Sequence, residues 1–139
     1  MNVVINVAAA VIEREGRILI CQRRGGRHAL KWEFPGGKIE PGEDARSALA
    51  RELREELQIE AAIGALLHSE TVHYPEGAAI HLEFYRINDF SGEPVNLQFE
   101  QIVWEQRRNL PAYDFLKGDV EFVKKLASAT NFPPDSEYL

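Results

Sequence analysis

The stretch 37–59, GKIEPGEDARSALARELREELQI, decides most of what this 139-residue chain can become. It opens as a turn and continues with apolar residues spaced three or four positions apart, which is typical of an amphipathic helix. The pattern predicts a helix that begins at Glu43 or Asp44 and runs to about Gln58. The apolar positions of this helix are Ala45, Leu49, Leu53 and Leu57.

Three glutamates share one side of the predicted helix. Glu52, Glu55 and Glu56 stand at i, i+3 and i+4 and fall within an arc of roughly 100°. That arc overlaps the apolar stripe, so the carboxylates lean toward the body of the domain. The three carboxylates repel one another, and a bound hard cation would remove this repulsion. A few oxygen ligands that leave room for water and phosphate suit Mg²⁺. The alternative is a solvated helix face.

The same residues match a named pattern, G-x5-E-x7-R-E-U-x-E-E-x-G-U with U aliphatic, which is the Nudix box. The only departure is Gln58, which stands where the pattern has a glycine that lets the helix end in a left-handed turn. The stretches 32–40 and 113–119 and the hairpin ending at Arg23 and Arg24 also resemble MutT-type nucleoside triphosphate pyrophosphohydrolases. The resemblance covers nearly the whole chain except its last ten residues.

The expected fold is α/β, with a mixed β-sheet in an α/β/α sandwich, and the resemblance implies the same Nudix fold. We expect one domain over residues 1–129 and a loosely ordered tail over 130–139, which has two prolines and no periodic pattern. The first two strands are expected to pair as a hairpin. The predicted strands are Val3–Ile12, Arg17–Gln22, Ile59–Leu67, Ile80–Ile87 and Ile102–Trp104, and the predicted second helix is Val120–Ala127.

The resemblance implies a metal site. It assigns Mg²⁺, with Mn²⁺ as a substitute, to Glu52, Glu56 and Glu55, together with the carbonyl group of Gly36. Arg51 lies beside Glu52 and four residues before Glu55, where its guanidinium can orient their carboxylates. Glu55, Glu56 and Arg51 are therefore also candidate catalytic residues.

Water activation needs a base or a metal-bound hydroxide. The family often supplies a further glutamate from a loop across the metal, and Glu100 is the candidate here. Gln98 is the alternative position, although an amide cannot act as a base. Glu100 can also be a plain surface glutamate.

Basic residues flank the predicted metal site. Arg24 and Lys38 are the first choices for triphosphate contacts, followed by Arg23 and His28, because Arg and Lys complement phosphate oxygens. Each of them can equally be a solvated loop residue.

Asp119 has two interpretations. It can cap the last helix, or it can face the nucleobase, as the corresponding position does in the MutT-like family. A carboxylate accepts two hydrogen bonds, which matches the N1–H and amine donors of guanine. Cytosine offers one donor and a ring acceptor, so it requires a protonated Asp119 or an intervening water.

The leading functional hypothesis is Mg²⁺-dependent hydrolysis of a nucleoside triphosphate to the monophosphate and pyrophosphate, with 8-oxo-dGTP as the implied substrate. Alternatives are a CTP or dCTP pyrophosphohydrolase, a hydrolase of another nucleoside diphosphate derivative, and a non-catalytic nucleotide sensor. The net charge of −6 argues against a nucleic-acid polymer as partner. A single cysteine, Cys21, and no long apolar run fit a cytoplasmic protein, as monomer or homodimer, without a membrane segment.

Overall fold

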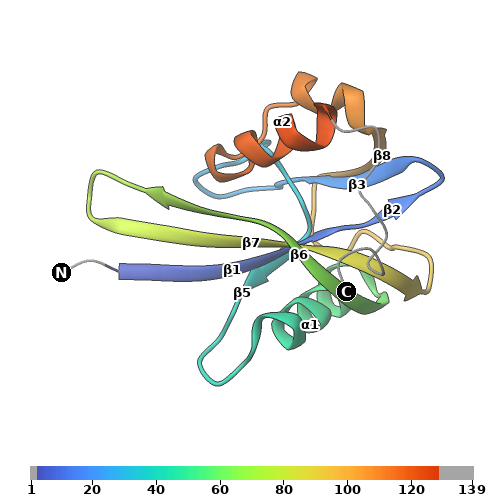
Figure 1. The fold of residues 1–139 in the computed structure, drawn as a ribbon, viewed down its shortest axis with the longest axis horizontal. Helices are drawn as coiled ribbons and strands as arrows, with labels where there is room; N and C mark the ends of the chain where they lie inside the picture. Colours follow the sequence, from blue (N-terminus) through green and yellow to red (C-terminus); the bar gives the residue numbers. More distant parts are fainter. Residues whose placement is uncertain (1–2, 129–139) are drawn as a thin grey trace.

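Two β-sheets and two α-helices form the described part of the chain, residues 3–128, in the computed structural model (Figure 1). The first sheet is mixed, because β1 runs parallel to β7 while the other pairs are antiparallel. Its strand order is β5 (Gly36–Lys38), β1 (Val3–Val11), β7 (Ala78–Ser91) and β6 (Glu60–His73). The second sheet is antiparallel and contains β2 (Glu13–Arg14), β3 (Arg17–Gln22), β4 (Trp32–Glu33) and β8 (Gln101–Gln106).

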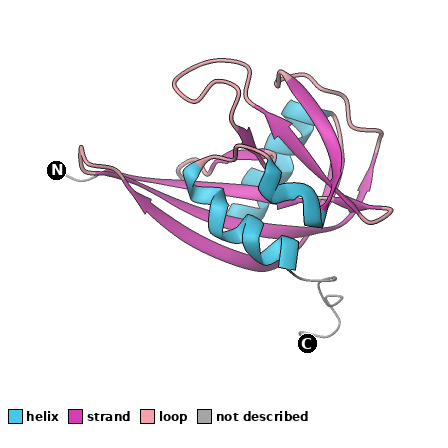
Figure 2. Ribbon diagram, turned by 90° about the horizontal axis from the view of Figure 1, so that it is seen from above, coloured by secondary structure: helices cyan, strands magenta, loops and turns pink. Residues whose placement is uncertain are grey.

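The two α-helices lie on opposite sides of the mixed sheet (Figures 1 and 2). Helix α1 (Ala45–Leu57) packs on one face, and α2 (Val120–Ser128) lies on the other with the 3₁₀ helices η1 (Arg107–Ala112) and η2 (Lys117–Asp119). The predicted α/β/α sandwich with a mixed sheet is therefore confirmed. The separate antiparallel sheet is a feature that the sequence patterns did not reveal.

The second half of strand β1, Ala8–Val11, is apolar and buried because both of its faces are covered. Ala8 and Ala10 belong to the buried cluster under α1, which also contains Leu49, Leu53 and Leu57. Ala9 and Val11 belong to the cluster under α2, which also contains Phe34, Phe84 and Phe122. A strand buried on both faces loses the alternation of polar and apolar residues that marks a half-exposed strand.

The predicted hairpin between Val3–Ile12 and Arg17–Gln22 is wrong. Both edges of β1 are occupied, by β5 over residues 7–9 and by β7 along its whole length. The chain therefore leaves the mixed sheet after β1, and β3 pairs with the two-residue strand β2. Glu15 and Gly16, with φ values of 54° and 78°, make the tight turn of that short hairpin.

Strands β6 and β7 contain 14 residues each, so both exceed the predicted ranges. They form an antiparallel pair with register shifts between residues 62 and 68. The polar residues at the ends of these strands obscured their extent, because ladder hydrogen bonds continue beyond the apolar core.

Helix α1 agrees with the prediction at both ends. The Asp44 side chain caps it by accepting a hydrogen bond from the Ser47 N–H at 2.8 Å. Gln58 adopts the left-handed conformation with φ of 57° and ends the helix where the family pattern has glycine. A non-glycine residue in this conformation costs roughly 1–2 kcal/mol. Within residues 3–128, no helix has the length and apolar character needed to cross a membrane. The predicted tail, 130–139, lies outside the described residues.

Candidate active site

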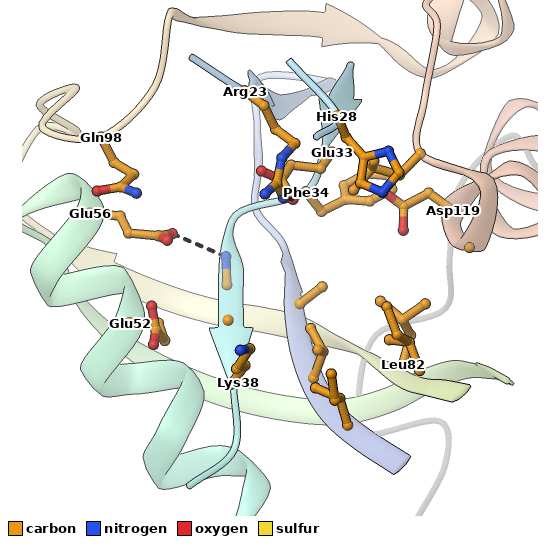
Figure 3. Close-up of a pocket in the computed structure, with 18 of the residues that line it drawn as sticks. Arg23, His28, Glu33, Phe34, Lys38, Glu52, Glu56, Leu82, Gln98 and Asp119 are labelled. Atoms are coloured by element: carbon orange, nitrogen blue, oxygen red, sulfur yellow. Dashed lines mark hydrogen bonds and ion pairs between the residues drawn. The ribbon is translucent and has the colours of Figure 1, made fainter. Parts of the chain in front are cut away.

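A cavity of about 520 Å³ brings together most of the sequence-predicted site residues (Figure 3). Glu52 and Glu56 of α1 lie at one end. Asp119, Phe34 and Leu82 lie at the other, on the α2 side of the mixed sheet. Lys38, Arg23 and His28 lie between these ends or along the rim. The cavity is therefore acidic at one end and partly apolar at the other.

The acidic end depends on two glycines of β5. The Gly36 N–H donates a hydrogen bond to Glu56 Oε1 at 3.2 Å. A Cβ atom on Gly36 would lie 2.1 Å from the Ala8 carbonyl oxygen, and one on Gly37 would lie 2.4 Å from Glu52 Cδ. Only glycine allows β5 to approach both β1 and the helix carboxylates this closely.

Burial disfavours the charged forms of these carboxylates. Burial, reinforced by the negative charge of Glu52, raises the pKa of Glu56 to about 8. Burial also raises the pKa of Glu52, although the Arg51 guanidinium opposes this. Neighbouring desolvated carboxylates at a cavity wall are the setting in which a divalent cation replaces a proton.

The Arg51 guanidinium contacts three glutamates, Glu43, Glu52 and Glu55. It binds Glu43 through Nε and Nη2 at 2.8 and 2.9 Å and donates from Nη1 to Glu52 Oε1 at 3.0 Å. Contacts of 3.4 Å to Glu55 and 3.3 Å to the Lys38 carbonyl oxygen complete the cluster. Arg51 does not line the cavity, and of the carboxylates that it contacts only Glu52 does. Its hydrogen bonds lower the pKa of Glu43 to about 2.

The donor set suits a Mg²⁺ ion that keeps part of its water shell. Glu52, Glu56 and the backbone of Gly36 line one end of the cavity, whereas the Glu55 side chain is 57% exposed and does not line it. Among residues 3–128, no three acidic, histidine or cysteine side chains converge on a common point. A site with few protein ligands leaves coordination positions for water and phosphate oxygens, which is how Mg²⁺ is commonly held at phosphate sites.

The four predicted phosphate contacts all line the cavity, with different partners. Lys38 is exposed, and Arg24 donates to the Phe99 carbonyl oxygen at 2.7 Å. Arg23 instead turns toward Glu33, with Nη1 3.2 Å from Oε1. His28 lies on the same side of the cavity as Asp119 in Figure 3. Arg24 and Lys38 therefore fit phosphate better than Arg23 does.

The structure does not bring Glu100 to the cavity. Glu100 is exposed, its N–H donates to the Gln22 carbonyl oxygen at 2.9 Å, and it is absent from the cavity lining. Gln98 lines the cavity instead and lies near Glu56 in Figure 3. A base must reach the water that it activates, so this geometry argues against the predicted catalytic role of Glu100.

Asp119 is buried at the far end, with 2% of its surface exposed. Burial, and then the nearby Glu33 carboxyl, raise its pKa well above the usual range, and Arg23 opposes this. Within residues 3–128, no hydrogen bond joins its side chain to a backbone N–H at the start of α2, so the helix-cap interpretation lacks its defining contact.

Glu33 is a cavity residue that the sequence analysis missed. It lies between two buried aromatic residues, Trp32 and Phe34. The sequence contained a signal for Glu33: an acidic residue between two large aromatic residues. Because side chains alternate along a strand, Glu33 is expected on the face opposite to the side chains of its two neighbours. Figure 3 shows Glu33 beside Arg23, between Glu56 and Asp119.

Comparison with known proteins agrees with this geometry. The sequence model of the NUDIX domain family matches residues 3–126 of this chain. The chain belongs to the Nudix family. It is 41% identical over 123 residues to the CTP pyrophosphohydrolase of Escherichia coli, which covers 86% of this chain and 89% of that protein. It is 35% identical over 130 residues to the 8-oxo-dGTP diphosphatase of Haemophilus influenzae, which covers 92% and 95%.

Solved Nudix structures have the same fold. The crystal structure of a MutT NUDIX hydrolase from Burkholderia pseudomallei has a TM-score of 0.79 and 27% identity, covering 90% of this chain and 98% of that one. The solution structure of the Escherichia coli ORF135 protein has a TM-score of 0.81 and 39% identity, covering 88% of each chain. The chain is therefore a MutT-like Nudix hydrolase that acts on nucleotides. Nudix hydrolases generally use a divalent metal such as Mg²⁺.

Proposed function

We propose that this Nudix protein hydrolyses nucleoside triphosphates to the monophosphate and pyrophosphate, with a cytosine nucleotide as its preferred substrate. The observation that supports this most directly is Asp119, which is buried at the end of the cavity without a hydrogen-bond partner among the described side chains. A buried carboxyl without a cation bound to it favours the neutral acid. A neutral acid donates one hydrogen bond and accepts another, which complements N3 and the amine of cytosine.

The phosphate end of the proposed site is provided by α1 and β5. Glu52, Glu56 and the Gly36 carbonyl group would hold Mg²⁺, whereas the exposed Glu55, the third carboxylate that the sequence suggested, does not line the cavity. When bound, the metal would neutralise phosphate charge and lower the pKa of a bound water. Lys38 and Arg24 contact phosphate oxygens, and Arg51 keeps Glu52 and Glu55 in position.

The base end of the proposed site is an apolar slot closed by Asp119. Phe34 and Leu82 line this end and provide apolar contact area for a base. Gly118 lies so close to Leu82 that a Cβ atom would come within 2.4 Å of Leu82 Cδ1. A side chain at position 118 would therefore press on Leu82 in the wall of the cavity, next to Asp119.

A second candidate substrate is 8-oxo-dGTP, whose removal would protect DNA synthesis from an oxidised precursor. The Haemophilus influenzae relative carries this activity in its name, at 35% identity. Oxidised guanine also suits a neutral Asp119, because N7–H beside O6 presents a donor next to an acceptor.

The test is pyrophosphate release from a nucleotide panel by the purified protein, with Mg²⁺ and with excess chelator. The panel contains CTP, dCTP, GTP, dGTP, 8-oxo-dGTP, a nucleotide sugar and a dinucleoside polyphosphate. We expect the highest kcat/KM with CTP or dCTP and no turnover in chelator. A preference for the nucleotide sugar or the dinucleoside polyphosphate would reject the proposal, and an absence of turnover would favour a sensor.

A further inference from the structure

We propose that Asn96 is a positioning residue that holds the amide of Gln98 at the metal end of the cavity, where Gln98 orients the attacking water. This inference rests on the proposed function, which assigns hydrolysis to this cavity, but it applies to whichever nucleotide the site prefers. Gln98 is the residue that contacts the water, and Asn96 acts through Gln98.

The side chain of Asn96 makes three hydrogen bonds to the backbone that follows it. Its Oδ1 accepts from the N–H groups of Gln98 and Phe99 at 3.2 and 2.7 Å. Its Nδ2 donates to the Phe99 carbonyl oxygen at 2.9 Å. An asparagine that bonds the backbone two or three residues ahead fixes the shape of a tight turn. Asn96 therefore shapes the chain around Gln98.

The same loop is attached to the end of α1. The Val95 N–H donates to the Leu57 carbonyl oxygen at 2.9 Å, and the Leu97 N–H donates to the Glu56 carbonyl oxygen at 3.1 Å. The last carbonyl groups of a helix have no partner within the helix, so they can bind a neighbouring loop. Glu56 thus lines the metal end with its side chain and anchors the Gln98 loop through its backbone.

Phe99 fixes the chain on the other side of Gln98. Its side chain is buried in the cluster under α1, and its carbonyl oxygen also accepts from Arg24 Nη2 at 2.7 Å. A carbonyl oxygen has two lone pairs, so it can accept from Arg24 and Asn96 together. Gln98 therefore lies between two anchored backbone positions, and its side chain lines the cavity near Glu56 (Figure 3).

An amide at this place can orient a water but cannot take its proton. The Gln98 side chain has a carbonyl oxygen that accepts a hydrogen bond from water and an NH₂ group that donates to a phosphate oxygen. Such contacts suffice to direct a water at a phosphorus atom, and they add no proton-transfer step to the hydrolysis. Their effect depends on placement, because a displacement of about 1 Å can lower a rate by about 100-fold.

A double-mutant cycle tests whether Asn96 acts through Gln98. Steady-state turnover of the preferred nucleotide is measured for the wild-type protein, Asn96→Ala, Gln98→Ala and the double variant. We expect each single variant to lower kcat by about 10- to 100-fold and to change KM by less than about threefold. The double variant should be within about twofold of Gln98→Ala, because residues that act as a unit give non-additive losses.

Two kinetic outcomes would overturn the proposal. Losses that multiply in the double variant would show that Asn96 acts independently of Gln98, as a loop residue that only supports the fold would. A higher KM at unchanged kcat would show that Asn96 acts on nucleotide binding instead, through Arg24.

Two further variants complete the set. Asn96→Asp keeps an acceptor for the two N–H groups but loses the donor to the Phe99 carbonyl oxygen, so its kcat should lie between those of the wild-type protein and Asn96→Ala. It also takes the place of Asn96→Ala in the cycle if the alanine variant does not fold. Asn109→Ala is the matched control, because Asn109 is an exposed asparagine that donates to Glu105 outside the cavity, and it should leave kcat unchanged.

Nuclear magnetic resonance with Mn²⁺ provides a readout that needs no turnover. Paramagnetic broadening falls steeply with distance, so the Gln98 side-chain amide should broaden at Mn²⁺ concentrations that leave the Asn109 side-chain amide sharp. This selective broadening should weaken in Asn96→Ala. Equal broadening of Gln98 in the two proteins would overturn the proposal. An absence of turnover with every nucleotide would reject the proposed function, whereas the Mn²⁺ result still decides whether Asn96 places Gln98.

Discussion

The carboxylate of Glu52 rests against the bare Cα of Gly37, so closely that a Cβ atom there would lie 2.4–2.7 Å from its Cδ and both oxygens. Helix α1 and strand β5 can therefore pack this closely because Gly37 has no side chain. Because the contact is with the far end of a flexible side chain, an added methyl group would displace the carboxylate and leave the fold intact.

We therefore expect Gly37→Ala to lower kcat by about 10- to 100-fold and to raise the Mg²⁺ concentration required for half-maximal activity, as for other disturbances of metal-ligand orientation. Gly25→Ala is the matched control, because an added Cβ atom there meets nothing within 4 Å. Mg²⁺ titrations of activity for the two variants make the comparison. Normal Mg²⁺ dependence of Gly37→Ala would show that Glu52 is not a ligand.

Glu56→Gln tests the other buried carboxylate. The amide keeps the shape of the side chain but removes the anionic oxygen, so turnover should fall by more than about 100-fold, beyond the loss for an outer partner of a ligand. The melting temperature of the metal-free protein should not decrease near neutral pH, because the raised pKa of about 8 keeps the folded-state Glu56 largely neutral there and the amide is neutral as well. Near wild-type turnover of well-folded Glu56→Gln would eliminate the proposed metal site.

The stability of the metal-free protein should depend on pH through Glu56. Its folded-state pKa of about 8 exceeds the unfolded value of about 4.3, so the folded state holds this proton where the unfolded state has lost it. The resulting stabilisation is complete below the unfolded pKa and is lost as pH rises toward about 8, at up to roughly 1.4 kcal/mol per pH unit. Thermal melts in chelator should show this decline, and Glu56→Gln should show a flatter profile. Added Mg²⁺ should raise the melting temperature most at the alkaline end.

Arg51→Lys should remove the contacts that hold Glu43 and Glu52 around one side chain. An ammonium group cannot reproduce the simultaneous contacts of the guanidinium with Glu43, Glu52 and the Lys38 carbonyl oxygen. We expect a 10- to 100-fold lower kcat/KM and a higher Mg²⁺ requirement. Arg54→Lys is the control on the same helix, because within residues 3–128 the Arg54 guanidinium binds only the exposed Glu60. Equal activities of the two variants would remove the positioning role of Arg51.

Glu100→Gln should change kcat by less than about twofold, as an exposed substitution remote from the cavity would. Steady-state kinetics with the preferred nucleotide measure this directly. A large fall in kcat at unchanged KM would mean that the loop moves Glu100 to the water during turnover, and it would restore the catalytic role that the sequence suggests.

Local sequence determined the parts of this protein that depend on neighbours along the chain. The span of α1 and the clustering of Glu52 and Glu56 follow from helical periodicity, because residues three or four apart share a face. The start of α1 follows from Asp44, whose side-chain oxygen can accept from a backbone N–H of the first turn. The resemblance to the Nudix family assigned the Gly36 carbonyl group to the metal site, and the structure places Gly36 in β5 with its N–H bonded to Glu56.

Only the tertiary structure decided which side chains face one another across the cavity. Sequence could not show that Gln98 lines it while Glu100 points away, since a shift of two residues in a loop changes no periodic pattern. Nor could it show that β1 leaves β3 for another sheet, or that Arg23 reaches Glu33 beside a buried Asp119. These relationships join residues far apart in the chain, and they are fixed by packing and strand pairing that no local pattern records.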